Sequence, residues 1–506
     1  MFIKNKMIRD TVLLTVMQLF LDSAALLLNV FINDRLGSSA MGVLSLTGAF
    51  LAMASILSNG NAFLCTSRLI SEEIGHKNGS PDKVLFHGIK LCMIMSVIVS
   101  AVLLMEADRV VRMFFEGADI SGPIKLIPAA LICGAISSCL KGYFNACRKS
   151  AVTAAGDIIE FLVKSLFIVG VTLFSGNTAN NSVCVIMVSG IAAGNVSSMI
   201  FFTVAYMRGH GPLRKNSTLD FKQYMKYALP IMGGGVLTTF LSSTNDTLIP
   251  YCLRQNGDST TEALSRFGIF EAIVIPTLFF PSVVLCSMSG IIVSETARAS
   301  AAGNSERIQT LSGRIKDSTI MYAVFASAVL IRFGRTIGEL IGGGELAGEI
   351  ISLTAPVIPF IYLEIVLEAI IKGTGQQAFS SLNYLAEYII RISSVLIIVP
   401  RIGFYGVVFS YYTSNIIGNI SRFIFLTRTT GMKINFIRSI LVPVVYSFMT
   451  LSASELIFFL MHIDNKSPVF MVTEVIIWGA EYYTIMMLLG KIKINRTVNK
   501  KAVVHI

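Results

Sequence analysis

The feature that most constrains this chain is a succession of apolar segments, each about 20 residues long, running from one end to the other. A helix needs roughly 20 apolar residues to cross the hydrocarbon core of a bilayer. The chain is 54% hydrophobic and only 14% charged, whereas a soluble domain has about 25% charged residues. The pattern predicts an all-α polytopic membrane protein with about 14 transmembrane helices, located in a plasma or inner membrane.

The predicted spans are joined by short connections, and their even number puts both ends of the chain on one side of the membrane. Loops on that side hold 27 Lys and Arg residues, and the opposite loops hold nine. The positive-inside rule therefore places both termini in the cytoplasm. The net charge of +11 is then mainly a topology signal with some attraction to anionic membrane lipids, and no nucleic-acid partner is expected. The spans cover residues 10–33, 40–63, 84–105, 122–144, 153–175, 183–206, 226–250, 266–293, 317–338, 349–371, 380–399, 404–427, 436–460 and 468–490.

The sequence contains no pattern typical of an enzyme, a metal site or a disulfide framework. Its eight cysteines form no CxxC pair, and its five histidines have no ligand spacing. No Ser-His-Asp or Cys-His set and no GxxxxGK[ST] phosphate loop can be placed. We therefore expect a protein that is not an enzyme, with no catalytic residue, no bound metal and no resident cofactor.

The two halves of the chain resemble each other. Residues 21–37 align without gaps with residues 241–257, Ser71–Glu72 corresponds to Ser294–Glu295, and Lys141–Gly142 corresponds to Lys372–Gly373. Because six spans start on the same side in each half, the repeat is parallel, and transporters of this form hold their substrate between the halves. The repeat predicts an N-terminal lobe over 1–210, a C-terminal lobe over 211–430, and an accessory helix pair with a basic tail over 431–506.

Two apolar spans carry an acid followed four residues later by a base. The pairs are Glu160 with Lys164 and Glu387 with Arg391, and the spacing puts each pair on one helical face. A charge at the bilayer centre costs about 2.5–3.5 kcal/mol, so each pair should partly neutralise itself and face the bundle. One interpretation is an internal salt bridge that locks its helix. The other is a cavity wall where the two bases bind a phosphate or diphosphate and the acids are counter-charges.

Five further acids lie inside predicted spans: Asp22, Asp246, Glu271, Glu364 and Glu368. Glu364 and Glu368 share a helical face with no basic residue at hand, so at least one of them is expected to hold a proton. Together with Asp22 and Glu271 they are candidates for coupling to H⁺ or Na⁺. Protonated carboxyls bonded to neighbouring Ser or Thr are the alternative.

Asp246 ends the polar run SSTNDT near the outer end of its span, and it is a candidate for the cavity wall. A water-facing helix surface explains the same run without a ligand. Glu455, Glu474 and Glu481, in the last two spans, are expected near the membrane interfaces.

Several ordered motifs resemble a known family. They are SRLISEEIGHKNG, LKGYFNACRKSAVTAAGDIIEFLVK, NDTLIP, IIVSETARA, and IIKGTGQ followed by VPRIGFYGVV. The chain resembles the multidrug/oligosaccharidyl-lipid/polysaccharide (MOP) exporter superfamily over residues 10–430, and within it the stage V sporulation protein B and polysaccharide exporter branch, which is related to lipid II flippases. The resemblance implies two six-helix lobes around a central cavity, working by alternating access without ATP hydrolysis. It also implies that the two acid–base pairs match an element of the family's fifth and eleventh helices.

Three functions are compatible with these features. The first is a monomeric flippase that moves a lipid-linked oligosaccharide or peptidoglycan precursor to the outer leaflet during cell-envelope synthesis. The second is a cation-coupled antiporter of drugs or organic cations, of the MATE type, which the excess of embedded acids favours. The third is a scaffold that recruits envelope synthases, and it gives no reason for two matched charged pairs.

Overall fold

A computed structural model describes residues 2–75, 81–106, 125–147, 149–174, 180–209, 220–301, 303–432, 437–460 and 468–503 of the 506-residue chain. Regular structure within these ranges is entirely helical, so the predicted all-α class is confirmed. Long apolar helices make the chain a multi-pass membrane protein.

The helical segments up to residue 269 are α1 (Phe2–Leu36), α2 (Ser38–Asn59), α3 (Ala62–Gly75), α4 (Pro81–Met105), α7 (Ile127–Ala146), α8 (Ser150–Phe174), α9 (Asn180–Gly209), α10 (Phe221–Asn256) and α11 (Thr260–Ile269). They are followed by the π-helical turn η1 (Phe270–Val274), α12 (Ile275–Phe279), the 3₁₀ turn η2 (Phe280–Ser282), α13 (Val283–Ala301), α14 (Ser305–Leu340), α15 (Gly344–Thr354), η3 (Ala355–Val357) and α16 (Ile358–Gly373). The last segments are α17 (Gln377–Ile402), α18 (Phe404–Thr430), η4 (Ile437–Leu441), α19 (Val442–Leu460) and α20 (Pro468–Val503).

Among the described residues, all fourteen predicted spans fall on helical segments; residues 122–124, 175 and 436 of three predicted spans lie outside the described residues. Eleven described helices are long and apolar enough to cross a membrane, so the predicted count is approximate. The other three predicted spans, 153–175, 226–250 and 404–427, fall on α8, α10 and α18. These three helices carry ionisable or amide side chains well inside their length, which is typical of helices that face a bundle interior.

The chain forms two compact units by its backbone contacts. Unit 1 consists of Met1–Val283 and Tyr384–Thr413, and unit 2 consists of Val284–Asn383 and Ser414–Ile506. Helices α17 and α18 therefore each contribute one end to unit 1 and the other end to unit 2. This division follows contacts rather than the sequence repeat, and the boundaries predicted from the repeat stay a prediction.

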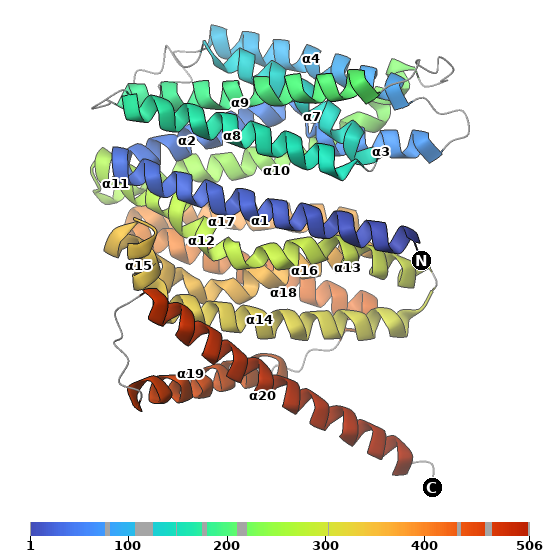
Figure 1. Ribbon diagram of the computed structural model, residues 1–506, viewed down its shortest axis with the longest axis vertical. Helices are drawn as coiled ribbons and strands as arrows, with labels where there is room; N and C mark the ends of the chain where they lie inside the picture. Colours follow the sequence, from blue (N-terminus) through green and yellow to red (C-terminus); the bar gives the residue numbers. More distant parts are fainter. Residues whose placement is uncertain are drawn as a thin grey trace. The chain divides into compact units, whose positions relative to one another are not determined.

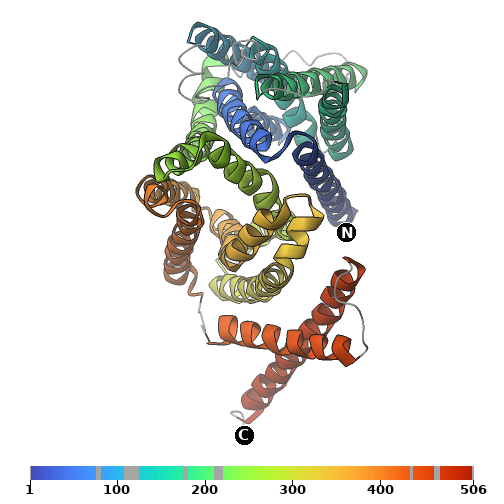
Figure 2. The same ribbon diagram turned by 90° about the vertical axis from the view of Figure 1, so that its left-hand side faces the viewer.

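The helices of unit 1 lie side by side and nearly parallel or antiparallel (Figure 1), and many of them are seen close to end-on in the turned view (Figure 2). One core of this unit is built from α3, α4, α7, α9 and α10 around buried residues such as Cys65, Cys139, Phe144 and Tyr224. A second core joins α1, α2, α8, α9 and η1. All eight cysteines of the chain are free thiols, and five are buried, as small apolar residues would be.

The second predicted span is broken at Gly60 and Asn61, where α2 ends and α3 begins. Both residues have positive φ angles, 54° and 60°. A Cβ on Gly60 would lie 2.4 Å from a side-chain atom of Met232 in α10. Glycine is required here because the backbone is left-handed and another helix packs directly against it.

Unit 2 is organised around α14, which packs against α15, α16, α19 and α20. Phe325 of α14 stacks on Tyr482 of α20 at 5.4 Å between ring centroids and meets Trp478 edge-on at 5.1 Å. The two C-terminal helices cross one another in both ribbon views (Figures 1 and 2). Aromatic packing thus attaches the accessory pair to the rest of this unit.

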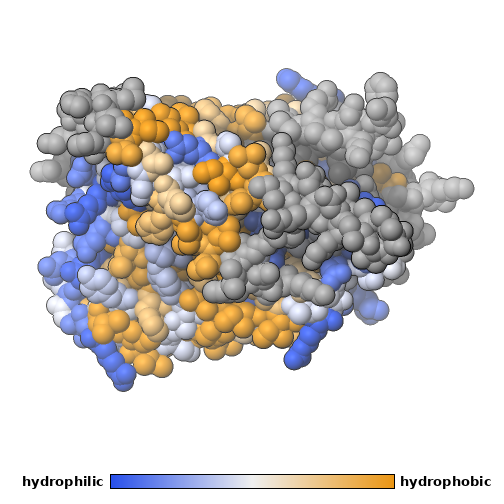
Figure 3. All heavy atoms as spheres, turned by 90° about the horizontal axis from the view of Figure 1, so that it is seen from below, coloured by the Kyte–Doolittle hydropathy of each residue, from blue (hydrophilic) through white to orange (hydrophobic). Residues whose placement is uncertain are grey.

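Apolar side chains cover much of the surface. On the face drawn in Figure 3, broad areas of apolar side chains lie between hydrophilic side chains gathered toward the edges. Leu27, Leu166, Leu382 and Ile476 are each at least 64% exposed. A soluble protein rarely exposes this much contiguous apolar surface, whereas lipid tails would cover it in a membrane.

Candidate functional site

The helix that follows residue 260 is interrupted, and Glu271 lies in the interruption. The π-helical turn η1 spans Phe270–Val274, and the 3₁₀ turn η2 follows at Phe280–Ser282. Such turns leave backbone groups that need partners inside a membrane. The side-chain amide of Asn29 in α1 donates to the carbonyl oxygen of Ala272 at 2.8 Å. A π turn inside a helix frequently marks a functional site.

Asp246 of α10, Glu271 of η1 and Arg391 of α17 gather in unit 1. The positive charge of Arg391 acts on both carboxylates, and the two carboxylates act on each other. The Asn245 side-chain amide donates to Asp246 Oδ1 at 3.2 Å. The Oε2 atom of Glu271 is buried without a hydrogen-bond partner among the residues that the structure describes. We call these three ionisable side chains the acid–arginine cluster.

Two tyrosines hold the guanidinium of Arg391. Its carbon Cζ lies 4.4 Å from the ring centroid of Tyr411 in α18 and 5.5 Å from that of Tyr388 in α17. Tyr411 is only 7% exposed, so the guanidinium stacks on a fixed aromatic face. With two acids and one base, the cluster can accept a proton or a small cation. If the acids are neutralised, it presents Arg391 to an anion.

Glu387, one turn before Arg391 on α17, is 4% exposed. The burial agrees with a face that turns into protein rather than into lipid. The predicted couple between Glu387 and Arg391 stays a prediction, and the structure adds that Arg391 also faces the two acids of the cluster.

Glu160 and Lys164 lie on the face of α8 that packs against α9. A Cβ on Gly194 of α9 would lie 3.0 Å from the backbone oxygen of Glu160 and 3.2 Å from Lys164 Cβ. The two charges act on each other and Ser198 of α9 interacts with the Glu160 carboxylate. No ion pair within 4 Å joins the two side chains, both of which are described. Lys164 Nζ lies 5.5 Å from the ring centroid of Phe161.

Glu364 and Glu368 share a basic partner that the sequence did not predict. Arg422 of α18 is fully buried, and its Nε donates to Glu368 Oε1 at 2.8 Å while its Nη2 donates to Glu364 Oε1 at 3.2 Å. Lys372 Nζ lies 3.6 Å from Glu368 Oε2, which also accepts a hydrogen bond from Ser380 at 2.5 Å.

The expectation that no basic residue is at hand was therefore wrong. A later helix brings Arg422, 54 residues beyond Glu368, against the acidic face of α16. Two acids and two bases balance their charges, so the reason for expecting a proton on Glu364 or Glu368 no longer holds. The charge of Arg422 inside the predicted span 404–427 was the signal that could have revealed it.

The hydrogen bond that the structure describes for Asp22 is made within its own helix, α1. Its Oδ1 accepts a hydrogen bond from Gln18 of the same helix at 2.7 Å. Among the described residues, neither Asp246 nor Glu271 shows an electrostatic interaction with Asp22, and the coupling role of Asp22 stays a prediction.

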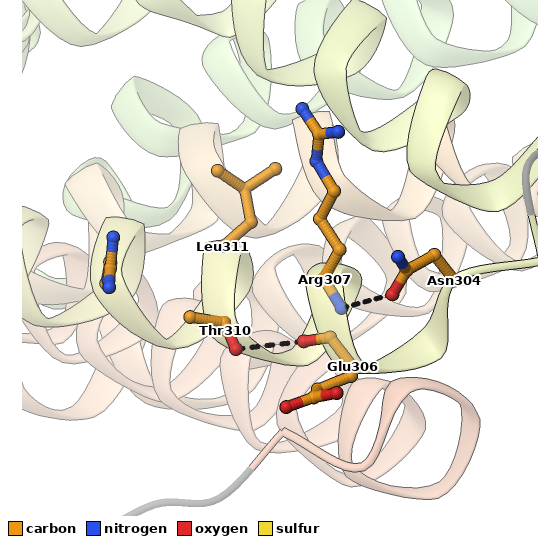
Figure 4. Close-up of a pocket in the computed structure, with 6 residues that line it drawn as sticks. Asn304, Glu306, Arg307, Thr310 and Leu311 are labelled. Carbon is orange, nitrogen blue, oxygen red and sulfur yellow. Dashed lines mark hydrogen bonds between the residues drawn. The ribbon is translucent and has the colours of Figure 1, made fainter.

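A surface groove of about 400 Å³ lies beside the N-terminal end of α14 (Figure 4). Asn304 Oδ1 accepts a hydrogen bond from the backbone N–H of Arg307 at 2.9 Å and caps the helix. Glu306, Thr310, Leu311 and Arg314 complete the lining. None of the predicted site residues lines this groove, so the candidate site rests on the charged groups described above.

Comparison with known proteins supports a transporter fold. No protein-family profile matches the chain. Stage V sporulation protein B of Bacillus subtilis (strain 168) is 19% identical over 403 residues, which cover 77% of each protein.

Two solved structures illustrate the shared architecture. The lipid II flippase MurJ, in an inward closed conformation, matches with a TM-score of 0.71 at 13% identity and covers 96% of this chain and 100% of MurJ. A MATE family multidrug transporter in an inward-facing conformation matches with a TM-score of 0.61 at 17% identity, covering 81% of this chain and 95% of the transporter. The resemblance inferred from the motifs is thus confirmed, and the chain has the fold that MurJ and the MATE transporters share in the MOP superfamily.

Proposed function

We propose that the protein is a flippase that moves a lipid-linked oligosaccharide or peptidoglycan precursor across the membrane by alternating access. The observation that carries this proposal is the extent of the likeness to MurJ, which spans 96% of the chain against 81% for the MATE transporter. The difference corresponds to roughly 76 residues, about the length of the predicted accessory segment 431–506. On this proposal the accessory pair of helices, α19 and α20, distinguishes the chain from a drug exporter that lacks it.

The substrate's phosphate or diphosphate is the group that the embedded bases would bind. Arg391 offers a planar fork suited to phosphate oxygens, and Tyr411 holds that fork in place. Lys164 would supply a second positive charge from the other predicted lobe. Asp246 and Glu271 would then be counter-charges that hold Arg391 before the substrate arrives.

The remaining properties of the proposal follow from the sequence. The excess of basic loop residues on one side supports cytoplasmic termini. We propose a monomer in contact with anionic membrane lipids, driven by a gradient of H⁺ or Na⁺ rather than by ATP. Asp22 and Glu271 are the candidate coupling residues.

A cation-coupled antiporter of organic cations is the second candidate function. The acid–arginine cluster favours it, because two carboxylates outnumber one guanidinium at a buried place. Under this alternative the acids bind the transported cation or the coupling ion, and Arg391 tunes them.

The deciding experiment measures how much lipid-linked precursor is accessible in the outer leaflet of cells with and without the protein. The double variant Lys164→Gln/Arg391→Gln should abolish the difference while remaining in the membrane. The matched control Lys226→Gln/Arg401→Gln changes exposed bases on α10 and α17 and should keep it. Equal accessibility with and without the protein would reject the flippase, and export of organic cations by the same cells would favour the antiporter.

A further inference from the structure

The C-terminal helix α20 is fixed to its neighbours by one face. The indole Nε1 of Trp478 donates to the Ser447 carbonyl at 3.1 Å and contacts the Thr450 hydroxyl at 3.0 Å, both on α19. The Tyr482 hydroxyl donates to the Met321 carbonyl of α14 at 3.1 Å. Trp478 and Tyr482 are fully buried. This face is therefore an ordered contact surface between α14, α19 and α20.

Glu474 lies on the same face, one turn before Trp478, and it is 1% exposed. Neither Oε1 nor Oε2 of Glu474 has a hydrogen-bond partner among the described residues. A carboxyl group near a membrane interface could reach water or lipid head groups, but this one is enclosed by protein. An enclosed carboxylate without a partner is among the costliest groups that a folded protein can hold.

The charged neighbours of Glu474 come from both helices that pack on α20. Arg332 of α14 and Glu455 of α19 act on it with opposite signs. Arg332 Nε already donates to Glu455 Oε1 at 3.0 Å, and these two side chains are 35% and 45% exposed. The nearby positive charge is thus engaged by a more exposed acid, and Glu474 gains little from it. Glu481, two turns later on α20, has a buried Oε2 that also lacks a partner among the described residues.

We propose that Glu474 binds a proton in the folded protein and forms a proton-sensitive junction with Arg332 and Glu455. With the proton bound, Glu474 is neutral and Arg332 stays with Glu455, so the three groups carry no net charge. When the proton leaves to water, the three groups carry one negative charge, and Arg332 is drawn between two carboxylates. The attachment of α19 and α20 to α14 then depends on proton concentration.

A proton is favoured over a metal cation as the ligand. Among the described residues, no three His, Cys, Asp or Glu side chains are grouped so that they can hold a metal ion. Two carboxylates with a guanidinium between them are a poor site for a metal, whereas a single proton neutralises the buried one. The junction shares no residue with the acid–arginine cluster. Its test therefore does not depend on the flippase proposal.

The test uses the full chain in lipid nanodiscs and compares its thermal midpoint Tm between about pH 5 and about pH 8. A proton bound by the folded state but released by the unfolded chain stabilises by mass action. The Tm of the wild type should therefore fall as pH rises. Glu474→Gln, which imitates the protonated carboxyl, should lose this part of the fall and have a higher Tm than the wild type at about pH 8.

Two further measurements keep the test decisive. The infrared carbonyl band of protonated carboxylic acids should be weaker in Glu474→Gln than in the wild type and in the control Glu345→Gln, which changes an exposed acid of α15. Should Glu474→Gln fold poorly, Arg332→Gln provides the second variant, because removing the positive charge should move the fall in Tm to higher pH. An unchanged pH profile in Glu474→Gln would overturn the proposal. So would a Tm that rises with Na⁺ at fixed pH and requires Glu474.

Discussion

The side-chain hydroxyl of Ser38, at the start of α2, lies 2.5 Å from the hydroxyl of Ser265 in α11. The two backbones also touch just beyond this contact. A Cβ on Gly268 would come 2.2 Å from the backbone nitrogen of Gly42, and a Cβ on Gly42 would come 1.9 Å from the carbonyl oxygen of Leu264. Helix α2 belongs to the predicted N-terminal lobe and α11 to the C-terminal one. We expect rocking of the two predicted lobes against each other to open this contact during the transport cycle.

A covalent bond at this contact should stop transport. In a background without the eight native cysteines, Ser38→Cys/Ser265→Cys places two thiols where two hydroxyls now meet. A thiol oxidant should form the disulfide by removing two electrons and two protons. We expect substrate movement to fall at least tenfold on oxidation and to return after reduction, as measured by the outer-leaflet accessibility assay.

The single variants Ser38→Cys and Ser265→Cys, treated with the same oxidant, are the controls and should keep their activity. Full activity of the completely cross-linked protein would show that α2 and α11 stay together throughout the cycle.

The glycines of the contact predict a second effect. Gly42→Ala pushes a methyl group into the Leu264 backbone, so the contact between α2 and α11 must open. We expect a loss of stability of about 1–3 kcal/mol, the usual range for an overpacked site. Thermal unfolding in detergent measures it. Gly170→Ala in α8 is the matched control because its new Cβ would meet nothing within 4 Å, and it should be neutral or slightly stabilising.

The span positions could be predicted from the sequence because membrane crossing is a local property. Apolar length alone placed all fourteen segments on helices. The spacing of Glu160 and Lys164 also put both on one face, since a helix fixes the direction of residues four apart. The packing of that face on Gly194 of α9 could not be predicted, because it depends on which helices become neighbours.

Side-chain partners on distant helices could not be predicted from the spacing of residues along one helix. Arg422 balances Glu364 and Glu368 from another helix. Apolar periodicity also did not predict the π turn at Phe270–Val274, which lies just before Pro276 and Pro281. Its hydrogen-bond partner, Asn29, lies 243 residues away from Ala272. Such long-range contacts depend on which helices pack together in three dimensions. They leave no local pattern in the sequence from which they could be predicted.

The acid–arginine cluster predicts a non-additive pair of mutations. Arg391→Gln leaves the charges of Asp246 and Glu271 uncompensated in a buried place, and it should reduce transport strongly. Adding Glu271→Gln removes one of those charges. We expect the double variant to recover at least part of the protein's stability, with a coupling energy of about 0.5–3 kcal/mol in a double-mutant cycle.

The cycle is measured by thermal unfolding together with the leaflet assay. Pairing Arg391→Gln with Glu262→Gln, an exposed acid that caps α11, is the control and should show no coupling. Stability that recovers without transport would assign Arg391 to the substrate. Strictly additive effects of Arg391→Gln and Glu271→Gln would show that the two charges do not depend on each other.

The buried network of Arg422 predicts opposite results for partial and complete removal. Arg422→Gln leaves Glu364 and Glu368 with only the half-exposed Lys372, and it should destabilise the protein by about 3–5 kcal/mol. Replacing Arg422 by Met and both acids by Leu together should recover most of this loss, since apolar groups of similar size often substitute for a buried ion network. Thermal unfolding in detergent compares the variants.

Arg428→Gln, an exposed base on the same helix, is the control and should change stability by less than about 0.5 kcal/mol. If Arg422→Gln were as stable as this control, Glu364 and Glu368 would not need the guanidinium and would hold a proton instead. That result would return both acids to the list of coupling residues. The predicted large loss would instead make this network a fixed brace between α16 and α18, and it would leave ion coupling to Asp22 and Glu271.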